Sequence, residues 1–301
     1  MWENRLSAEQ AAAVDALAAR AAATDGFDPL NEEARLSRAS GEARHLLVTD
    51  GQHLVGYLVH LPAHRTAQLV VDPAHRRRGI GTRLAQALAA DAPLRLWAFH
   101  DAPAAQGLAR HFGLVEGRAL LVMEKSFEHK PGEFGDSRGL STPTAAASRF
   151  VRADPGIELR GYRPDDDAEL LRVNAAAFAH HPEQGGLDEA GLAARMAEEW
   201  FDPDGLIVAA EDGRLLGFHW TKRVGEVGEV YVVGVDPAAQ GRGLGRRLLT
   251  AGLDHLAGAG CRSVILYVDS ADTVAVGMYL SAGFGVAHRD VLYVPASEER
   301  Q

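Results

Sequence analysis

One stretch of the chain reads Val70-Val71-Asp72-Pro73-Ala74-His75-Arg76-Arg77-Arg78-Gly79-Ile80-Gly81-Thr82, and a second reads Gly234-Val235-Asp236-Pro237-Ala238-Ala239-Gln240-Gly241-Arg242-Gly243-Leu244-Gly245-Arg246. Each follows an apolar run typical of a β-strand, and each opens a predicted amphipathic helix. A strand that leads through small residues into a helix N-terminus presents several backbone N–H groups to one anion. The chain therefore carries two candidate phosphate-binding turns.

The spacing of the two turns predicts a duplicated domain. They are 164 residues apart, measured from Val71 to Val235, which is too long for a solenoid repeat. The 301 residues are also about twice a typical domain. We predict an α+β protein of two tandem domains, at 1–128 and 157–301, joined by a linker at 129–156. Each domain is expected to be a mostly antiparallel mixed sheet of about seven strands flanked by about four helices.

Periodicity and turn signals place the expected elements in a similar order in both halves. In the first half we expect helices at 11–23, 31–40, 81–90 and 104–111, and strands at 45–49, 53–60, 66–71, 94–99 and 120–124. In the second half we expect helices at 166–178, 188–200, 244–256 and 273–282, and strands at 157–162, 206–211, 215–222, 229–235, 263–268 and 291–294.

Composition excludes several kinds of partner. The net charge of -10 argues against nonspecific nucleic-acid binding, and no apolar stretch is long enough to span a membrane. The single cysteine, Cys261, cannot form an intramolecular disulfide, and no Cys/His spacing suggests a metal. We expect a soluble, cytoplasmic monomer with no metal, nucleic-acid or membrane partner. The Ala-, Arg- and Gly-rich bias is typical of a GC-rich genome, such as that of an actinobacterium.

The turn itself excludes two common phosphate motifs. Leu84 and Leu248 stand where a Rossmann fold has its third glycine, and the Gly-Lys-Ser/Thr of a P-loop is absent. The pattern Arg/Gln-x-x-Gly-x-Gly after Val-Asp-Pro resembles that of the GNAT superfamily of N-acetyltransferases. The resemblance implies that the pyrophosphate of acetyl-CoA binds this turn, with Arg76–Arg78 neutralising CoA phosphates. The alternatives are a glycine-rich helix start that binds nothing and a solvated basic patch.

Acetyl transfer to an amine needs a proton acceptor for the amine and a proton donor for the departing thiolate. Glu229 opens the strand that ends at the second turn, and Tyr279 begins the sequence Tyr-x-x-x-Gly-Phe. The repeat carries Glu229 onto Arg65 and Tyr279 onto Ala109, so the first half lacks both groups. We predict that the second half is catalytic and the first is not. A surface carboxylate and a tyrosine packed on the sheet are the alternative interpretations.

Three further segments resemble the mycothiol synthase family. They are Phe178–Gly186, Gly217–Lys222 and Glu229–Pro237, and Leu30-Asn31-Glu32 adds to them near the N-terminus. The resemblance implies transfer of acetyl from acetyl-CoA to the cysteine amine of a cysteinyl-glucosaminyl-inositol, giving mycothiol and CoA. It also implies a first domain that binds a second acetyl-CoA without turning it over.

The same resemblance assigns binding residues position by position. Those facing the acceptor are Glu32, Glu183, Lys222, Glu229 and Tyr267. Those facing acetyl-CoA in the active half are Val233, Gly234, Val235, Gln240, Gly241, Arg242, Gly243, Leu244, Gly245, Arg246, Asp272, Thr273, Val274, Ala275, Val276 and Gly277. Those of the first half are Leu69, Val70, Val71, Arg77, Arg78, Gly79, Ile80, Gly81 and Thr82.

Some alternatives stay open at the level of sequence. The family commonly has Asn and a basic residue where this chain has Asp272 and Gly277, which weakens the acetyl-CoA contacts assigned to that helix. Lys222 could be a solvated lysine at a strand end, and His180-His181 could cap a loop. The acceptor could also be an aminoglycoside, a polyamine or a protein N-terminus, and a non-catalytic acetyl-CoA sensor is the remaining alternative.

Overall fold

The computed structural model describes residues 2–127, 156–179 and 182–298. These residues form two compact units. Unit 1 comprises Met1–Val122, Asp269–Thr273 and Ala287–Gln301, and unit 2 comprises Met123–Val268 and Val274–Val286. The predicted linker at 129–156 lies outside the described residues, apart from Gly156, and so do His180 and His181. The boundaries predicted for the two domains stay a prediction.

Unit 1 begins with two helices whose ends follow directly from the sequence. Ser7 caps the first helix, because the N–H of Gln10 donates to the Ser7 Oγ and the N–H of Ser7 donates to the Gln10 Oε1. Gly26, with a φ of 83°, ends it in the left-handed conformation. The elements of this unit are α1 (Ala8–Asp25), α2 (Glu32–Ser40), β1 (Arg44–Asp50), β2 (His53–Leu61), β3 (Thr66–Val71), α3 (Ile80–Ala89), β4 (Leu96–Ala98) and α4 (Pro103–His111), with most of β5 (Leu114–Ser126) and β11 (Gly285–Pro295).

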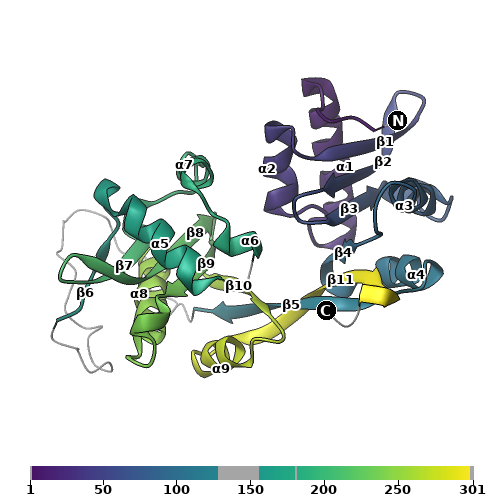
Figure 1. Cartoon of the computed structure of the whole chain (residues 1–301). Coiled ribbons are helices and arrows are strands. Elements are labelled where there is room, and N and C mark those ends of the chain that lie inside the picture. Colours follow the sequence, from purple (N-terminus) through teal and green to yellow (C-terminus); the bar gives the residue numbers. More distant parts are fainter. Residues whose placement is uncertain (1, 128–155, 180–181, 299–301) are drawn as a thin grey trace, which may run out of the picture. The chain divides into compact units, whose positions relative to one another are not determined.

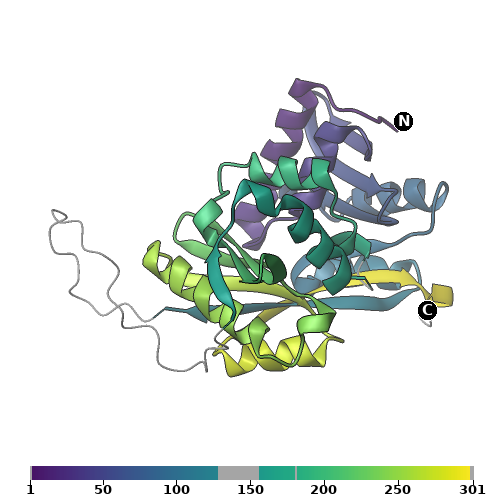
Figure 2. The ribbon, with the colours of Figure 1, turned by 60° about the vertical axis from the view of Figure 1, so that its left-hand side comes forward.

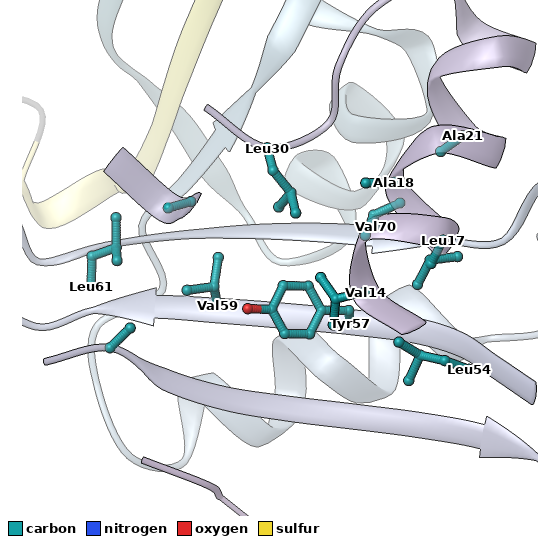
Figure 3. Packing of buried hydrophobic residues seen from close by; sticks show 12 residues of the cluster. Val14, Leu17, Ala18, Ala21, Leu30, Leu54, Tyr57, Val59, Leu61 and Val70 are labelled. Carbon is teal, nitrogen blue, oxygen red and sulfur yellow. The ribbon is translucent and has the colours of Figure 1, made fainter. Parts of the chain in front are cut away.

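The sheet of unit 1 has the order β1-β2-β3-β4-β11-β5. β1, β2 and β3 pair antiparallel, β3 and β4 pair parallel, and β4 pairs antiparallel with β11. One apolar cluster joins α1 and α2 to one face of this sheet, and Figure 3 shows its packing around Tyr57. A second cluster joins α3 to the other face (Figure 1).

Unit 2 repeats this arrangement. Its elements are β6 (Glu158–Gly161), α5 (Asp167–Ala177), α6 (Pro182–Gly185), α7 (Glu189–Met196), β7 (Leu206–Glu211), β8 (Arg214–Val224), β9 (Val227–Val235), α8 (Leu244–Gly258), β10 (Ser263–Asp269) and α9 (Thr273–Ser281). The sheet order is β10-β9-β8-β7-β6, and only the β9–β10 pair is parallel among these strands. α5 and α7 cover one face and α8 covers the other (Figure 1, Figure 2).

The predicted fold class is confirmed, since each unit is a mixed, mostly antiparallel sheet covered by helices. The duplication is visible in detail. β2 has one extra residue at Val55 opposite β1, and β8 has one extra residue at Leu216 opposite β7. Among the described helices, none is long and apolar enough to cross a bilayer.

Candidate active site

The candidate site of unit 2 is a gap between two parallel strands. β9 and β10 pair from Ser263↔Val227 to Ile265↔Glu229, and within these fully described strands their register ends at Glu229. β9 itself runs on for six residues, to Val235. The backbone groups on this edge of β9 are therefore not used by β10, and Glu229 stands where the gap begins.

Two N–H groups of β9 point into this gap. The N–H of Asp236, just after β9, donates to the carbonyl of Leu216 in β8 at 2.9 Å. Because successive N–H groups alternate in direction along an antiparallel strand, those of Val233 and Val235 point away from β8. An extended, amide-bearing chain lying in the gap would find hydrogen-bond donors there, which is what the predicted acetyl-CoA contacts of Val233 and Val235 require.

The glycine turn closes the far end of the gap. Gly241 and Gly243 have φ of 80° and 74°, the left-handed region that glycine adopts without steric cost. Gly243 is the N-cap of α8, and no side chain caps that helix. The first N–H groups of α8 are thus left to a ligand, with the positive end of the helix dipole behind them. This arrangement suits a pyrophosphate.

An ion pair between a half-buried arginine and a buried aspartate holds the turn. Arg172 in α5 donates through Nη1 to the Asp236 Oδ2 at 2.6 Å and through Nη2 to the Leu215 carbonyl at 2.8 Å. The other carboxylate oxygen of Asp236 accepts the N–H of Ala238 at 2.9 Å. The hydrogen bond from Arg172 and that from Ala238 lower the pKa of Asp236. The turn therefore starts from a fixed, ionised carboxylate.

The end of the gap at Glu229 also carries Lys222 and an aromatic cluster. Lys222 in β8 pairs directly with Glu229 across the strands, so both side chains lie on the face covered by α5 and α7. The Lys222 Nζ lies 4.8 Å from the ring centroid of Trp200 and 5.4 Å from that of Tyr231. The interpretation of Lys222 as a solvated strand-end lysine is not supported by these contacts.

Tyr231 marks a second bulge of unit 2, this one in β9. Trp220 pairs with Val232 and Thr221 with Val230, so Tyr231 is an extra residue without a partner position in β8. Such a bulge bends the strand locally. It lies two residues after Glu229, next to the start of the gap.

The remaining predicted residues occupy different parts of the fold. Tyr267 on β10 lies two residues after Ile265, the partner of Glu229, and so on the same face of the strand as Ile265; its side chain is half exposed. Tyr279 in α9 is buried, with its ring edge-on to Phe284. Glu183 lies in the short helix α6. Val274–Gly277 belong to α9 in unit 2, whereas Glu32, Asp272 and Thr273 belong to unit 1.

Unit 1 holds a second copy of the gap and the turn. β3 and β4 pair only at Ala67↔Leu96, and the N–H of Asp72 donates to the Val55 carbonyl as that of Asp236 does to Leu216. The N–H groups of Leu69 and Val71 therefore point toward this gap. Gly79, with a φ of 77°, is the uncapped start of α3, and the Arg20 Nε donates to Asp72 at 2.8 Å.

The predicted proton-handling groups, Glu229 and Tyr279, have no counterpart among the described residues of unit 1. β2 and β3 pair without a bulge, and Leu61, at the position of Lys222, pairs with Thr66. Strand pairing thus makes Thr66, rather than the predicted Arg65, the residue of unit 1 that is equivalent to Glu229. The difference arises because β9 has an extra residue at Tyr231 that β3 lacks. α4 and α9 both have nine residues, and Gly113 and Gly283 both follow with positive φ, which keeps Ala109 at the position of Tyr279.

Sequence reasoning missed the aromatic surroundings of Lys222. Trp200, Tyr231 and Arg195 come from three different segments, and only folding brings them together. Tyr231 alone had a local signal, since it stands two residues from Glu229 in a strand.

Comparison with known proteins places the chain among acetyltransferases. The family model described as Acetyltransferase (GNAT) family matches it twice, at residues 13–114 and 175–284. The mycothiol acetyltransferase of Nocardia farcinica (strain IFM 10152) is 48% identical over 307 residues, covering 97% of this chain and 96% of that protein. The mycothiol acetyltransferase of Mycobacteroides abscessus is 41% identical over 308 residues, covering 97% and 98%. These relatives come from actinobacteria.

Solved structures share the fold of the whole chain. A tandem GNAT protein from the clavulanic acid biosynthesis pathway has a TM-score of 0.68 at 18% identity, covering 95% of this chain and 94% of that chain. A GCN5-related N-acetyltransferase from Sphaerobacter thermophilus has a TM-score of 0.67 at 22% identity, covering 97% and 94%. At these identities the likeness concerns the fold alone.

Proposed function

Because the chain belongs to the acetyltransferase (GNAT) family, and within it to the mycothiol acetyltransferases, we propose that unit 2 acetylates the cysteine amine of desacetylmycothiol. Desacetylmycothiol is the cysteinyl-glucosaminyl-inositol, and the products are mycothiol and CoA. Acetyl-CoA-dependent N-acetyl transfer is the activity of the family. The observation that carries the finer proposal is a single gap with Glu229 and Lys222 at one end and a glycine turn at the other.

The gap divides the reaction between its two ends. The turn from Gln240 to Arg246 holds the pyrophosphate, and the N–H groups of Val233 and Val235 hold the pantetheine and the thioester carbonyl. Donors aimed at that carbonyl stabilise the negative charge that develops on its oxygen during attack.

Glu229 acts as the general base, directly or through a water. An α-amino group has a reference pKa near 8, so a fraction of it is already neutral near pH 7 and the demand on the base is modest. As Glu229 takes the amine proton, the nitrogen forms a bond to the carbonyl carbon and the C–S bond breaks. Tyr279 donates its proton to the departing thiolate, which leaves as the CoA thiol.

The first unit has a different role in this proposal. It binds a second acetyl-CoA at Leu69–Val71 and Arg77–Thr82 and does not turn it over. The absence of a carboxylate at Thr66 and of a phenol at Ala109, both within the described residues, supports this division of labour.

One assay tests the acceptor. The protein is incubated with acetyl-CoA and cysteinyl-glucosaminyl-inositol, and free CoA thiol and product mass are followed; we expect one acetylated amine per thiol released. Thiol release with spermidine, an aminoglycoside or a peptide N-terminus, but not with this acceptor, would assign the enzyme another amine. Tight acetyl-CoA binding without thiol release on any amine would indicate a sensor.

Replacing the base is the sharper test of mechanism. Glu229→Gln should lower kcat by about 100-fold or more while leaving acetyl-CoA affinity nearly unchanged, since a general base contributes roughly 10²–10⁴-fold. Thr66→Ala, at the position equivalent to Glu229, and Ala109→Ser, at the position of Tyr279, are the matched controls in unit 1 and should leave the rate unchanged, as should Arg65→Ala beside them. Wild-type turnover by Glu229→Gln would remove Glu229 from the mechanism.

A further inference from the structure

The ammonium of Lys222 is held by two aromatic rings rather than by solvent alone. The Nζ lies 4.8 Å from the Trp200 centroid and 5.4 Å from the Tyr231 centroid, both within the range of cation–π attraction. A long, flexible lysine side chain would otherwise sample many rotamers. The rings therefore select the conformations in which the charge stays over them.

Both rings are themselves fixed. Trp200 packs against Tyr231 and Trp220 with centroids 5.0 and 6.0 Å apart. The Tyr231 hydroxyl accepts a hydrogen bond from the Arg195 Nε in α7 at 3.0 Å. Phe201 packs edge-on against Trp220, on the periphery of this cluster. The cluster connects α7, the segment after it and two strands, so it forms a rigid support.

The support determines where the cation stands relative to the reaction. Lys222 pairs with Glu229, and Tyr231 is the bulge residue two positions after Glu229. We propose that Trp200 and Tyr231 are positioning residues that keep the Lys222 ammonium at the acceptor end of the gap. This inference rests on the proposed function, in which the acceptor binds at the end of the gap that holds Glu229 and Lys222.

A fixed cation at that place has consequences for specificity. An ammonium donates up to three hydrogen bonds, which suits the hydroxyl oxygens of a sugar or cyclitol. It repels an acceptor that carries several positive charges, such as a polyamine. By fixing the Lys222 ammonium, Trp200 and Tyr231 thus favour a polyol acceptor that bears one amine and disfavour polycationic amines. Trp200 is a specificity determinant because it holds the charge in place.

A double-mutant cycle tests whether Trp200 acts through Lys222. The variants are Trp200→Leu, Lys222→Met and the combination of the two, with kcat/KM for cysteinyl-glucosaminyl-inositol measured at saturating acetyl-CoA. We expect a loss of roughly 30-fold for Lys222→Met and of about 5- to 10-fold for Trp200→Leu. The combination should lose no more than Lys222→Met alone, because the ring has nothing left to hold.

Phe201→Leu is the matched control. It removes a neighbouring ring that packs edge-on against Tyr162 and Trp220, whereas the rings that face the Lys222 ammonium are those of Trp200 and Tyr231. We expect it to lower the melting temperature while leaving kcat/KM for the acceptor and KM for acetyl-CoA near wild type. An equal loss in Phe201→Leu and Trp200→Leu, or losses that multiply in the combined variant, would overturn the inference.

A selectivity measurement gives a second readout. Trp200→Leu and Lys222→Met should both raise the ratio of kcat/KM for spermidine to that for the polyol acceptor, by about 10-fold or more. An unchanged ratio in both variants would overturn the inference. Should Trp200→Leu fail to fold, Trp200→Phe replaces it, because phenylalanine keeps a ring that attracts a cation less strongly. We expect Trp200→Phe to give a ratio between those of wild type and Lys222→Met. A wild-type ratio in Trp200→Phe, together with a raised ratio in Lys222→Met, would also count against the inference.

Failure of the proposed function is distinguishable from failure of this inference. Wild-type protein that releases no CoA with cysteinyl-glucosaminyl-inositol contradicts the proposed function. The cycle is then measured with whichever amine supports the fastest CoA release, and non-additivity between Trp200 and Lys222 still tests the positioning role.

Discussion

His219 is completely buried in β8, on the face of the sheet that α8 covers. Its Nδ1 donates to the Leu248 carbonyl of α8 at 2.9 Å, and its Nε2 has no partner among the described residues. The ring fits because position 252 is glycine; a Cβ there would overlap the imidazole. Burial lowers the pKa of His219 to about 4, so the neutral form is the folded form.

This burial predicts an acid-sensitive unit 2. The unfolded chain binds a proton at His219 near pH 6.5 and the folded chain only near pH 4, so stability falls as pH drops from 6.5 to 4. Between pH 7 and pH 5 the loss from this residue should be about 2 kcal/mol. Urea unfolding of wild type and His219→Gln at both pH values measures it. The same acid sensitivity in both proteins would contradict the assignment to His219.

Among the elements, the glycine turns are the most faithfully duplicated. Asp72 and Asp236 each cap a short 3-10 turn, pair with an arginine of the preceding helical layer and precede an uncapped α-helix. Arg20 and Arg172 also reach equivalent carbonyls, those of Leu54 and Leu215. The pair sets where the turn begins and so where its N–H groups point.

Removing the carboxylate should therefore affect acetyl-CoA binding in unit 2. Asp236→Ala removes the cap and leaves Arg172 without its carboxylate partner. This should lower the free energy of unfolding by about 1–3 kcal/mol and raise KM for acetyl-CoA by about 10-fold. Asp72→Ala makes the same change in unit 1 and should cost similar stability with no change in the KM of the reaction. Thermal unfolding and initial rates give both quantities. Equal effects on the KM for acetyl-CoA in the two variants would contradict the expectation that only the turn of unit 2 serves the reaction.

Sequence patterns located these elements well because their signals are local. Val-Asp-Pro and the glycines identify the turn, and the predicted strand 66–71 and helix 273–282 agree with β3 and α9 within a residue. The bulge at Tyr231 has no such signal, because a single extra residue is visible only from the pairing partner. That residue is why a constant offset led to Arg65 instead of Thr66.

At the scale of the molecule, the longest strands were the hardest to predict. β5 and β11 were expected at 120–124 and 291–294 but run over Leu114–Ser126 and Gly285–Pro295. Each strand contributes residues to both compact units. The alternation of buried and exposed side chains is therefore not continuous along either strand, and a pattern of apolar and polar residues does not reveal its full length. The C-terminal half of β11 completes the sheet of unit 1 by pairing with β4.

In the proposed function, the duplication separates ligand binding from chemistry. Both units keep the turn, its ion pair and a gap beside a parallel strand, while the second bulge, Glu229, Lys222 and Tyr279 occur in unit 2 alone among the described residues. In the proposed function, the binding framework retained in both copies takes a ligand in both. If unit 1 had lost its ligand, the left-handed backbone at Arg77, which costs a non-glycine residue about 1–2 kcal/mol, would have no evident use.

The stoichiometry of acetyl-CoA binding decides this last point. Isothermal titration should find two molecules per wild-type chain. Gly79→Val and Gly243→Val each force a β-branched residue to a φ near 75°, with open space around the added Cβ, so each should remove one site through backbone strain alone. Only Gly243→Val should also abolish turnover. One molecule per wild-type chain, with the site lost in Gly243→Val and kept in Gly79→Val, would leave unit 1 a structural relic of the duplication.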